Sequence, residues 1–557
     1  MPAIYDLADR YVERLSELDP VSATMRGIQG HDAEMTDYSP TGIEAREELT
    51  RSTLATLGTL APATDRERTA AGVMQERLQV AHDFDHAGEP YRALNIISSP
   101  LQGIRQVFDV MPTETAEHWQ AVLSRMQRVP DALNGLRASL QEGLRRGVPA
   151  ARRQALACAQ QARVWSGGAP GTRPFFDTLV DRYDRSPVGD PAFSTRLQQA
   201  AAAAGAGYAE TASYLKDVYA PHAVEKDAVG SERYALGVRQ SLGMEIDVKQ
   251  AYHWGWAELH RIETQMQAVA DRIRPGEPLT QVIHLLETDP ARAIEGVDAF
   301  RQWLQDLMDR TIAELNGVHF DIPEPIRRVE AMIAPPGGAA AMYYTGPSED
   351  FSRPGRTWYP TLGRTRFPLW GEVSTAYHEG VPGHHLQVAQ VRYLAGVLSR
   401  YQRTVAWCPG YGEGWALYAE RLMKELGYLD NPDYELGMLR AQAFRATRVI
   451  IDIGMHLELR IPAEEENGGA RWTPELGLAF GQVHSREPAE FMRSEIDRYL
   501  GWPAQAISYK LGEREILAIR EELRARSGSA FDLKAFHSRL LGLGPMGLQQ
   551  LRDELLA

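Results

Sequence analysis

Apolar residues recur every three or four positions through the first part of the chain. The pattern begins at Leu7, Tyr11, Leu15 and Leu18, and similar stripes follow around residues 43–60, 66–83, 115–145, 149–163 and 191–218. Side chains at this spacing share one face of a helix, so the pattern is typical of amphipathic helices. The signal weakens between Pro221 and Gly243 and resumes over 248–272. We therefore expect a helical N-terminal part over residues 1–316.

A different pattern begins at Gly317. Short runs rich in β-branched and aromatic residues alternate with Pro/Gly turns, and these runs are 318–322, 328–333, 341–345 and 356–359. Such runs predict short strands, so we expect a small antiparallel sheet over residues 317–360. The pattern is helical again from Thr375, within a third part at residues 361–557. Because no Ser/Gly-rich linker divides the sequence, we expect a single, mainly α-helical unit over residues 1–557.

Composition narrows the class of protein. The chain has 557 residues, of which 44% are hydrophobic and 24% charged, and its net charge is −14. An acidic balance argues against nucleic acid or an anionic membrane as the main partner. The two cysteines, Cys158 and Cys408, are too few and too distant for a disulfide framework or a Cys-x-x-Cys site. Without a basic leader or an apolar run of about 20 residues, we expect a cytoplasmic location.

Three of the 15 histidines, His378, His384 and His385, lie close together in the sequence. Neutral imidazoles are common zinc ligands. The spacing nevertheless differs from H-E-x-x-H, in which two histidines four residues apart share a helical face. In an unbroken helix, residues six apart are separated by about 9 Å along the axis and point in different directions. One zinc ion could not bind both, because each Zn–N bond is only about 2.1 Å long.

Pro382 and Gly383 offer a way to bring these histidines together. Proline removes a backbone donor from the helix, and glycine tolerates a bulge. A break at this point would move His384 to the place that the residue at i+4 normally takes. Glu379, next to the first ligand, would then act as general base toward a metal-bound water. The other interpretation is a polar loop whose histidines are satisfied by ordinary hydrogen bonds.

A third ligand is expected from the segment 410–420. Glu413 and Glu420 are seven residues apart, on one face of an otherwise apolar helix. A carboxylate on such a face is costly unless it is paired or bound to a metal. Two histidines and one glutamate leave one position for water, as in catalytic zinc sites. We therefore expect one Zn²⁺ on His378, His384 and Glu413, with Glu420 hydrogen-bonded to a ligating histidine.

Three motifs together resemble a known family. They are His-Glu-x-x-Pro-Gly-His-His-Leu-Gln at 378–387, Glu-Gly-Trp-Ala-Leu-Tyr-x-Glu at 413–420 and Pro-x-Gln-Ala-x-x-Tyr-Lys-x-Gly at 503–512. The sequence resembles the domain-of-unknown-function 885 family over most of its length. That family resembles gluzincin metallopeptidases, particularly helical carboxypeptidases with His-Glu-x-Gly-His and a later glutamate ligand. The resemblance implies a mostly helical, cleft-bearing zinc hydrolase, and it selects His384 rather than His385 as the second ligand.

Two further clusters are candidates for completing the site. Arg448, Asp452 and His456 follow one another at four-residue spacing along one helical stripe. They form either a buried ion-pair ladder or a group that clamps a substrate carboxylate or stabilises an oxyanion. The second cluster lies at 498–510, where Trp502-Pro503 is expected to open a helix with Gln505 and Tyr509 on one face. Tyr509 is either the donor to a developing oxyanion or a core tyrosine.

The main hypothesis is a zinc-dependent hydrolase that cleaves peptide or related amide bonds of small substrates. Tyr509 or His456 would stabilise the oxyanion, and Arg448 or Lys510 would engage a terminal carboxylate. Strands around Tyr343 and Tyr344 would bind an extended substrate by strand addition. His385, Glu420, Asp452 and Gln505 would support the ligands or contact the substrate.

Two alternatives remain. One keeps the zinc and exchanges the peptide for a specialised amide or ester metabolite. The other is a non-catalytic helical binding protein with a degenerate metal site. Homo-oligomerisation is left open by the sequence.

Overall fold

The computed structural model describes residues 3–334 and 342–557 of the chain. The chain divides into two compact units. The first comprises Met1–Glu232 with Ser494–Trp502, and the second comprises Arg233–Arg493 with Pro503–Ala557. These limits differ from the parts expected at 1–316, 317–360 and 361–557. The helices between residues 233 and 316 pack with the later part of the chain, a pairing that helical periodicity alone does not reveal.

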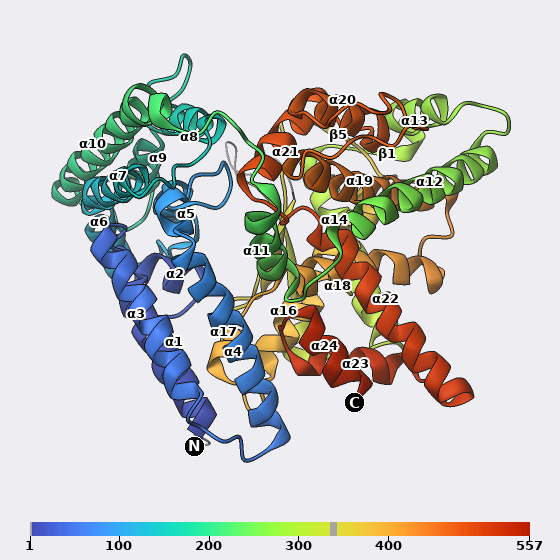
Figure 1. Cartoon of the computed structure of the whole chain (residues 1–557). Helices are drawn as coiled ribbons and strands as arrows, with labels where there is room; N and C mark the ends of the chain where they lie inside the picture. The colour runs from blue at the N-terminus through green and yellow to red at the C-terminus, as the bar shows by residue number, and fades with distance from the viewer. Residues whose placement is uncertain (1–2, 335–341) are drawn as a thin grey trace. The chain divides into compact units, whose positions relative to one another are not determined.

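The first unit is built from helices (Figure 1). Its helices are α1 (Ala3–Leu18), α2 (Pro20–Met25), α3 (Pro40–Leu57), α4 (Asp65–His86), α5 (Pro100–Val110), α6 (Ala116–Gln127), α7 (Val129–Arg145), α8 (Arg152–Trp165), α9 (Phe175–Asp184) and α10 (Pro191–Ser213). The unit also contains two short 3₁₀ helices, η1 (Glu89–Arg92) and η3 (Ala220–His222), and one short π-helix, η2 (Tyr214–Tyr219). Thr64 and Thr115 begin α4 and α6 by accepting a backbone hydrogen bond in the first turn. The stripes at 115–145, 149–163 and 191–218 contribute to one apolar core, as the sequence predicts, whereas the buried residues of α1, α3 and α4 lie outside that core.

The second unit is also mainly helical. Its helices are α11 (Gly230–Leu242), α12 (Val248–Ile273), α13 (Leu279–Thr288), α14 (Val297–Leu315), α15 (Glu372–Glu379), α16 (His384–Tyr393), α17 (Arg400–Thr404), α18 (Pro409–Glu425), α19 (Pro432–His456), α20 (Pro474–Ser485), α21 (Ala489–Gly501), α22 (Ser508–Ser527), α23 (Leu533–Leu543) and α24 (Leu548–Leu556). Short turns are η4 (Pro290–Arg292), η5 (Glu324–Arg327) and η6 (Gly528–Ala530). The few N-terminal residues of α11 and the C-terminal part of α21 belong to the first unit.

Two of these boundaries correct the sequence-based expectations. Helix α11 occupies most of the stretch where the helical signal is weak, because Tyr234 and Val238 are buried on one of its faces. Helix α22 begins at Ser508 and not at Trp502-Pro503. Residues 502–507 form turns, and Ala504 has a positive φ of 65°, which no helix accommodates. Gln505 therefore precedes the helix that carries Tyr509.

The strands form two small sheets in the second unit. One has the order β2 (Val329–Ile333), β4 (Gly355–Tyr359), β3 (Tyr343–Thr345), and the other pairs β1 (Ala293–Glu295) with β5 (Arg366–Pro368). The mainly α fold class is thus confirmed. Antiparallel pairing holds for β3–β4 and β1–β5, whereas β2 runs parallel to β4. The larger sheet is therefore mixed. Its central strand, β4, is parallel to β2 and antiparallel to β3.

One expected strand is a turn, and another lies partly outside the described residues. Residues 318–322 follow α14 as a tight turn in which the backbone amides of His319 and Phe320 donate to the carbonyl oxygen of Leu315. Phe320 and Ile322 are buried while Val318 is 63% exposed, so the apolar pattern reflects packing and not strand pairing. In the run 341–345, the first residue lies outside the described residues.

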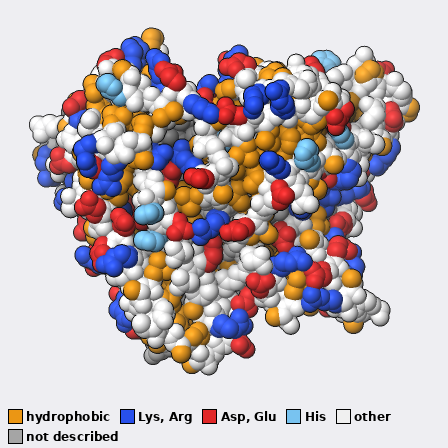
Figure 2. Space-filling model, viewed as in Figure 1, with side chains coloured by type: hydrophobic (Ala, Val, Ile, Leu, Met, Phe, Trp, Pro, Cys, Tyr) orange, Lys and Arg blue, Asp and Glu red, His pale blue; other side chains and the backbone are white. Residues whose placement is uncertain are grey.

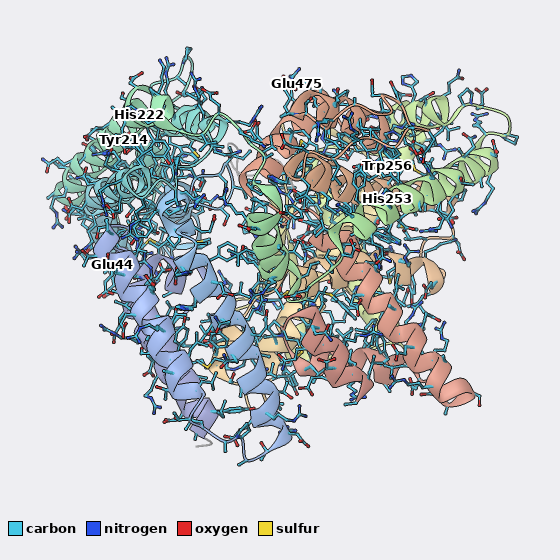
Figure 3. The ribbon with its side chains drawn as sticks, in the orientation of Figure 1. Glu44, Tyr214, His222, His253, Trp256 and Glu475 are labelled. Atoms are coloured by element: carbon cyan, nitrogen blue, oxygen red, sulfur yellow. The ribbon has the colours of Figure 1, made fainter. Side chains whose placement is uncertain are left out.

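Close helix packing in the second unit depends on glycines. A Cβ atom added at Gly414 of α18 would lie 2.6 Å from the Cα atom of Gly512 on α22, so the two backbones meet directly. Gly255 of α12 similarly faces Ile450 of α19, where an added Cβ would lie 3.1 Å from its Cγ1 atom. Trp256, labelled on α12 in Figure 3, packs its ring 5.0 Å from that of Phe480. These contacts hold α18 and α19 in place.

Charge is dispersed on the surface that Figure 2 shows. Acidic and basic side chains are interspersed across this face, with hydrophobic groups between them. Among the described residues, no helix is both long enough and apolar enough to cross a membrane.

We expect Gly414→Ala to destabilise the second unit, because its methyl group would meet the backbone of Gly512 and not a movable side chain. Overpacking of this kind costs about 1–3 kcal/mol. Gly542→Ala is the matched control, since Gly542 also lies in a helix but has nothing within 4 Å of its Cβ position. Urea unfolding followed by circular dichroism should show a lower midpoint for Gly414→Ala only; equal midpoints would contradict the close crossing of α18 and α22.

Candidate metal centre

The helix that carries His378 stops before His384. Helix α15 ends at Glu379, and α16 begins at His384. Between them the amide of Gly383 donates to the carbonyl oxygen of Tyr377 (3.0 Å). A Cβ atom added at Gly383 would lie 2.0 Å from the carbonyl oxygen of His378, so only glycine fits this approach. The expected interruption at Pro382-Gly383 is confirmed, as two separate helices and not as a bulge within one.

The interruption brings both histidines to one glutamate. The Nε2 atoms of His378 and His384 lie 3.5 Å and 3.4 Å from Oε2 of Glu413 on α18. The two imidazole rings are nearly perpendicular, at 89°. Each of the three residues offers a ligand atom within 4.8 Å of the other two. Ligand atoms about 2.1 Å from a tetrahedral zinc lie roughly 3.4 Å apart, so the arrangement fits one ion.

Glu413 has a buried carboxylate oxygen that faces both histidines. Its Oε2 atom is buried and makes no hydrogen bond within the part of the chain that the structure describes. Burial raises the pKa of this carboxyl group, but the neighbouring His378 and His384 imidazoles hold the pKa well below its usual range. The carboxylate is therefore ionised and faces two imidazole nitrogens. A divalent cation at this point would satisfy all three groups at once.

Glu420 orients the first histidine. Its Oε1 atom lies 2.8 Å from Nδ1 of His378, and its Oε2 atom accepts a hydrogen bond from the hydroxyl of Ser374. A carboxylate only accepts, so Nδ1 of His378 must donate, and the lone pair of a neutral imidazole then lies on Nε2, toward Glu413. Such a carboxylate–histidine pair is the usual support of a metal-binding imidazole. The expected hydrogen bond of Glu420 is present.

Ser374 was not among the residues expected from the sequence. It precedes His378 by four positions on α15, so both side chains share a helical face that turns toward α18. The four-residue spacing between Ser374 and His378 was therefore the sequence signal that could have identified Ser374. A serine at that position is too common in helices to single out without its partner Glu420.

Charge coupling in the cluster is strong. Burial by itself lowers the pKa of His378, but the carboxylates of Glu413 and Glu420 outweigh burial and raise this pKa to about 9. Glu379, the last residue of α15, contributes in the same direction. Its side chain is buried, so its carboxylate lies within electrostatic reach of His378 in a site of low solvent access.

His385 supports the site from the other side of α16. Its Nε2 atom donates to the carbonyl oxygen of Ile326 (2.7 Å), and its Nδ1 atom lies 2.9 Å from the hydroxyl of Tyr344 on β3. Both ring nitrogens are thus engaged, and burial lowers the pKa of the imidazole to about 4. A neutral ring with Nε2 protonated accepts from Tyr344 at Nδ1. His385 ties β3 to α16 and is not placed as a ligand.

The stripe on α19 is a packed arrangement. Oδ2 of Asp452 accepts hydrogen bonds from the hydroxyl of Tyr234 (2.6 Å) and the amide of Ala504 (3.0 Å). His456 is fully enclosed, with Nε2 at 3.9 Å from the other Asp452 oxygen. The guanidinium of Arg448 lies over the rings of Phe444 and Tyr509, at 4.2 Å and 4.6 Å. The ion-pair ladder is therefore the better description of Asp452 and His456.

Lys510 is not placed to bind a substrate. Its ammonium group is buried and contacts Oε1 of Gln442, Oε2 of Glu513 (2.6 Å) and Oε1 of Glu258 (3.0 Å). Three acceptors use the three donors of a lysine, so none remains for a terminal carboxylate. The expectation for Lys510 is wrong because the sequence does not show that Glu258, on α12, reaches it. Gln505 is buried in the turn before α22.

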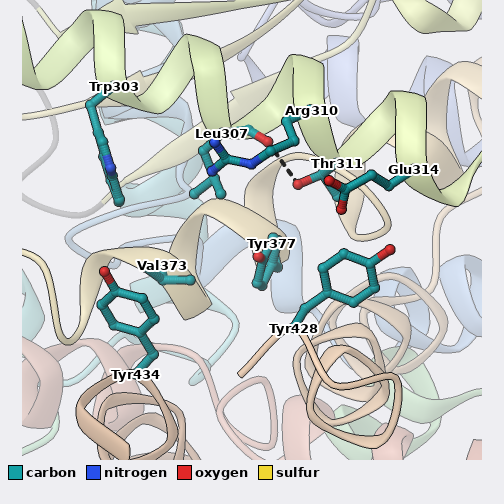
Figure 4. A pocket seen from close by; sticks show the side chains of 9 residues that line it. All are labelled: Trp303, Leu307, Arg310, Thr311, Glu314, Val373, Tyr377, Tyr428 and Tyr434. Atoms are coloured by element: carbon teal, nitrogen blue, oxygen red, sulfur yellow. Dashed lines mark hydrogen bonds between the residues drawn. The ribbon is translucent and has the colours of Figure 1, made fainter. Parts of the chain in front are cut away.

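A separate pocket of about 200 Å³ lies beside α15 (Figure 4). Val373 and Tyr377 of α15 line it together with Trp303, Leu307, Arg310, Thr311, Glu314, Tyr428 and Tyr434. Val373 and Tyr377 lie on a different face of the helix from Ser374 and His378, which turn toward Glu420. The pocket is therefore distinct from the histidine cluster.

The fold and the cluster define a large, mainly helical protein with two histidines and one glutamate gathered at a helix break. A family model described as "Bacterial protein of unknown function (DUF885)" matches residues 20–555, and the chain belongs to this family. No curated protein matches the chain.

Two solved structures are similar over the whole chain. A candidate lipoprotein from Colwellia psychrerythraea has a TM-score of 0.85 and 24% identity, covering 100% of this chain and 99% of its own. A candidate lipoprotein of unknown function from Shewanella oneidensis has a TM-score of 0.74 and 18% identity, covering 100% of both chains. At these identities the likeness shows the fold alone.

We expect Gly383→Ala to disrupt the helix break, because its methyl group would overlap the carbonyl oxygen of His378. The cost should exceed that of ordinary overpacking, about 1–3 kcal/mol, since backbone atoms cannot move aside. Gly396→Ala, in the turn after α16, has open space at its Cβ position and serves as the control. Thermal unfolding should show a clear loss for Gly383→Ala; wild-type stability would mean that the break does not need glycine.

Proposed function

We propose that this protein is a zinc-dependent hydrolase that cleaves peptide or related amide bonds in small substrates. The observation that carries the proposal is the convergence of His378, His384 and Glu413, with ligand atoms within 4.8 Å of one another. Two histidines and one glutamate are the protein ligands of catalytic zinc sites, which keep a position open for water. The hydrogen bond from His378 to Glu420 supports the same assignment. The likeness to gluzincin metallopeptidases rests on the motifs and is part of this proposal.

Each ligand has a defined task. His378 would bind through Nε2 because Glu420 holds the proton on Nδ1. His384 and Glu413 would complete the set from α16 and α18. Zinc in this position would supply Lewis-acid chemistry toward water and the substrate carbonyl.

Glu379 is the proposed general base. It directly follows His378 and is buried, so a proton accepted from the attacking water would stay within the site. Glu379 would take that proton and pass it to the leaving amine as the C–N bond breaks. The carboxylate then returns to its ionised form, and the cycle is balanced in protons.

Tyr509 is the proposed oxyanion donor. It lies near the start of α22, is partly exposed and has the Arg448 guanidinium 4.6 Å from its ring. A nearby cation favours a phenol as a donor to developing negative charge. His456 receives no part in the reaction, because its ring is enclosed between Asp452 and Tyr234.

Strand β3 is the proposed binding edge for an extended substrate. Among the described residues, β3 is hydrogen-bonded to β4 and ends the strand order β2-β4-β3. An edge strand offers backbone donors and acceptors to an added strand. Tyr343 stacks on Trp358 of β4 (5.8 Å between ring centroids), and Tyr344 connects β3 to His385, next to His384.

Two other functions would use parts of the same site. Hydrolysis of a specialised amide or ester metabolite would keep the metal and Glu379. A non-catalytic binding protein would need neither. Screening dipeptides, blocked peptides and N-acyl amino acids would distinguish hydrolysis of a specialised metabolite from hydrolysis of peptides. Measuring the metal content of the purified protein would distinguish a non-catalytic binding protein from either hydrolase.

The compartment and assembly stay predictions. The sequence predicts the cytoplasm, whereas the similar proteins from Colwellia psychrerythraea and Shewanella oneidensis are described as lipoproteins. Fractionation of cells that express the full-length protein would distinguish a cytoplasmic from a membrane-associated site. Size-exclusion chromatography would test for a homo-oligomer.

The decisive test is Glu379→Gln. We expect the purified wild-type protein to contain about one zinc per chain and to cleave members of a mixed peptide library. The variant should retain zinc and lose about 10²–10⁴-fold in kcat/KM, the usual contribution of a general base. Metal analysis and mass spectrometry of the products measure both. Full activity of Glu379→Gln with zinc bound would falsify the mechanism.

Glu420→Gln tests the support of His378. An amide can still accept a hydrogen bond but carries no charge, so the variant should bind zinc about 10–100-fold more weakly. Glu425→Gln is a control on the same helix, since Glu425 pairs with Arg520 and not with the histidines. Competition with a zinc-binding dye would measure the affinities. Equal affinity in both variants would remove Glu420 from the site.

A further inference from the structure

The pocket beside α15 is formed by three segments of the second unit (Figure 4). Helix α14 supplies one wall and α15 supplies another. The third comes from Tyr428, shortly after α18, and from Tyr434 in the first turn of α19. The volume of about 200 Å³ is below the roughly 300–1,000 Å³ of sites that bind drug-sized molecules. The pocket therefore has room for one small ligand and not for a peptide.

Aromatic side chains dominate the lining. Four rings and two aliphatic groups line the pocket, and they belong to Trp303, Tyr377, Tyr428, Tyr434, Leu307 and Val373. The aliphatic groups and Tyr377 are buried, whereas the other three rings are partly exposed. A ligand with an apolar ring would cover the exposed parts of these rings, and removing that surface from water would favour binding.

Two opposite charges lie on the α14 wall. Arg310 and Glu314 both line the pocket, four residues apart, and both side chains are exposed. Residues at this spacing on a helix commonly pair, yet within the described part of the chain neither side chain forms an ion pair. Burial raises the pKa of the Tyr377 phenol to about 12, with Arg310 acting against this rise and Glu314 adding to it. Both charges therefore lie within electrostatic reach of the buried ring.

Other charged groups near these walls have partners of their own. The carboxylate of Asp309 on α14 accepts a hydrogen bond from the amide of Gln305 (2.9 Å). Asp433, in the first turn of α19, pairs with Arg292. The charges that the pocket offers to a ligand are therefore the guanidinium and the carboxylate of its own α14 wall.

The charged and apolar parts of the lining are separated in space. Figure 4 shows Trp303 and Tyr434 toward one side of the pocket and Glu314 and Tyr428 toward the other. Along α14, Arg310 follows Trp303 by seven residues and precedes Glu314 by four, which is about 10 Å and about 6 Å along the axis. A ligand whose charged groups meet Arg310 and Glu314 would direct its ring toward Trp303 and Tyr434.

We propose that this pocket binds a free aromatic amino acid as its zwitterion. The carboxylate of the ligand would pair with the guanidinium of Arg310, and its ammonium group with the carboxylate of Glu314. The aromatic ring would lie between Trp303 and Tyr434. A free amino acid carries both charges on one carbon atom, whereas a residue inside a peptide carries neither. The site lies on a different face of α15 from His378, and the proposal does not rest on the hydrolase.

Calorimetry on the full-length protein tests the class of ligand. We expect L-phenylalanine to bind saturably, with a Kd at or below about 1 mM. L-alanine should bind at least about tenfold more weakly, because it lacks the ring whose burial favours binding. Absence of saturable binding of L-phenylalanine, or equal binding of L-alanine, would overturn the proposal.

Two analogues test the zwitterion. L-phenylalaninamide lacks the carboxylate, and N-acetyl-L-phenylalanine lacks the ammonium group. Each should bind about three- to fivefold more weakly than L-phenylalanine, a modest loss because ion pairs with exposed side chains are weak. Equal binding of all three compounds would show that neither charge is recognised and would overturn the proposal.

Variants assign each charge to its residue. Arg310→Gln should abolish the preference over the amide and keep the preference over the N-acetyl compound, and Glu314→Gln should do the reverse. Both side chains are exposed, so both variants should fold. Arg301→Gln is the matched control, since Arg301 lies on α14 outside the lining. Unchanged preferences in both pocket variants, or an equal loss in Arg301→Gln, would contradict the assignment.

A last comparison separates the pocket from the candidate metal centre, because a free amino acid could also bind a metal ion. His384→Ala removes one expected ligand, and His384 does not line the pocket. L-phenylalanine should bind this variant, and wild-type protein treated with a chelator, as tightly as the untreated protein. Loss of binding in both would place the ligand at the metal centre and overturn the proposal. Calorimetry involves no cleavage, so failure of the hydrolase proposal would leave this result standing.

Discussion

The close approach of Gly383 to the carbonyl oxygen of His378 is the constraint on which the candidate site depends. It lets the chain leave α15 and re-enter a helix at His384 without the spacing that one continuous helix would impose. Only then do two imidazoles that are six residues apart face the same carboxylate of Glu413. The helix break thus brings two histidines to one place, as the four-residue spacing of H-E-x-x-H does in an unbroken helix.

Burial determines what the two glutamates of this site require from their surroundings. The α18–α22 crossing, with Gly414 against Gly512, keeps Glu413 and Glu420 inside the second unit. In such an environment an ionised carboxylate needs a cation or hydrogen-bond donors. Glu420 has two donors, Ser374 and His378, whereas Oε2 of Glu413 lies 3.5 Å and 3.4 Å from Nε2 of His378 and His384. The two glutamates of one motif therefore have different roles.

Several buried charges of the second unit are paired within the protein. Lys510 and Arg421 are paired with Glu513 and Glu258, and Asp452 is satisfied by Tyr234 and Ala504. Glu349 likewise lies near two arginines, 3.3 Å from Arg403 and 4.0 Å from Arg392.

The sequence alone determined the helical class and the helix break, because these follow from local rules. Periodicity predicts helices, and proline with glycine predicts the interruption. The motifs single out Glu413 and Glu420 beside the histidines. Family membership followed from the same motifs and was confirmed over residues 20–555.

Only the tertiary structure decided which polar residues are available. Lys510 looks like a free cation until Glu258 of α12 is placed beside it, and Ser374 is unremarkable until it meets Glu420. The parallel pairing of β2 with β4 depends on residues far apart in the chain. Local pattern carries no information on such pairings, because they are set by which surfaces bury one another.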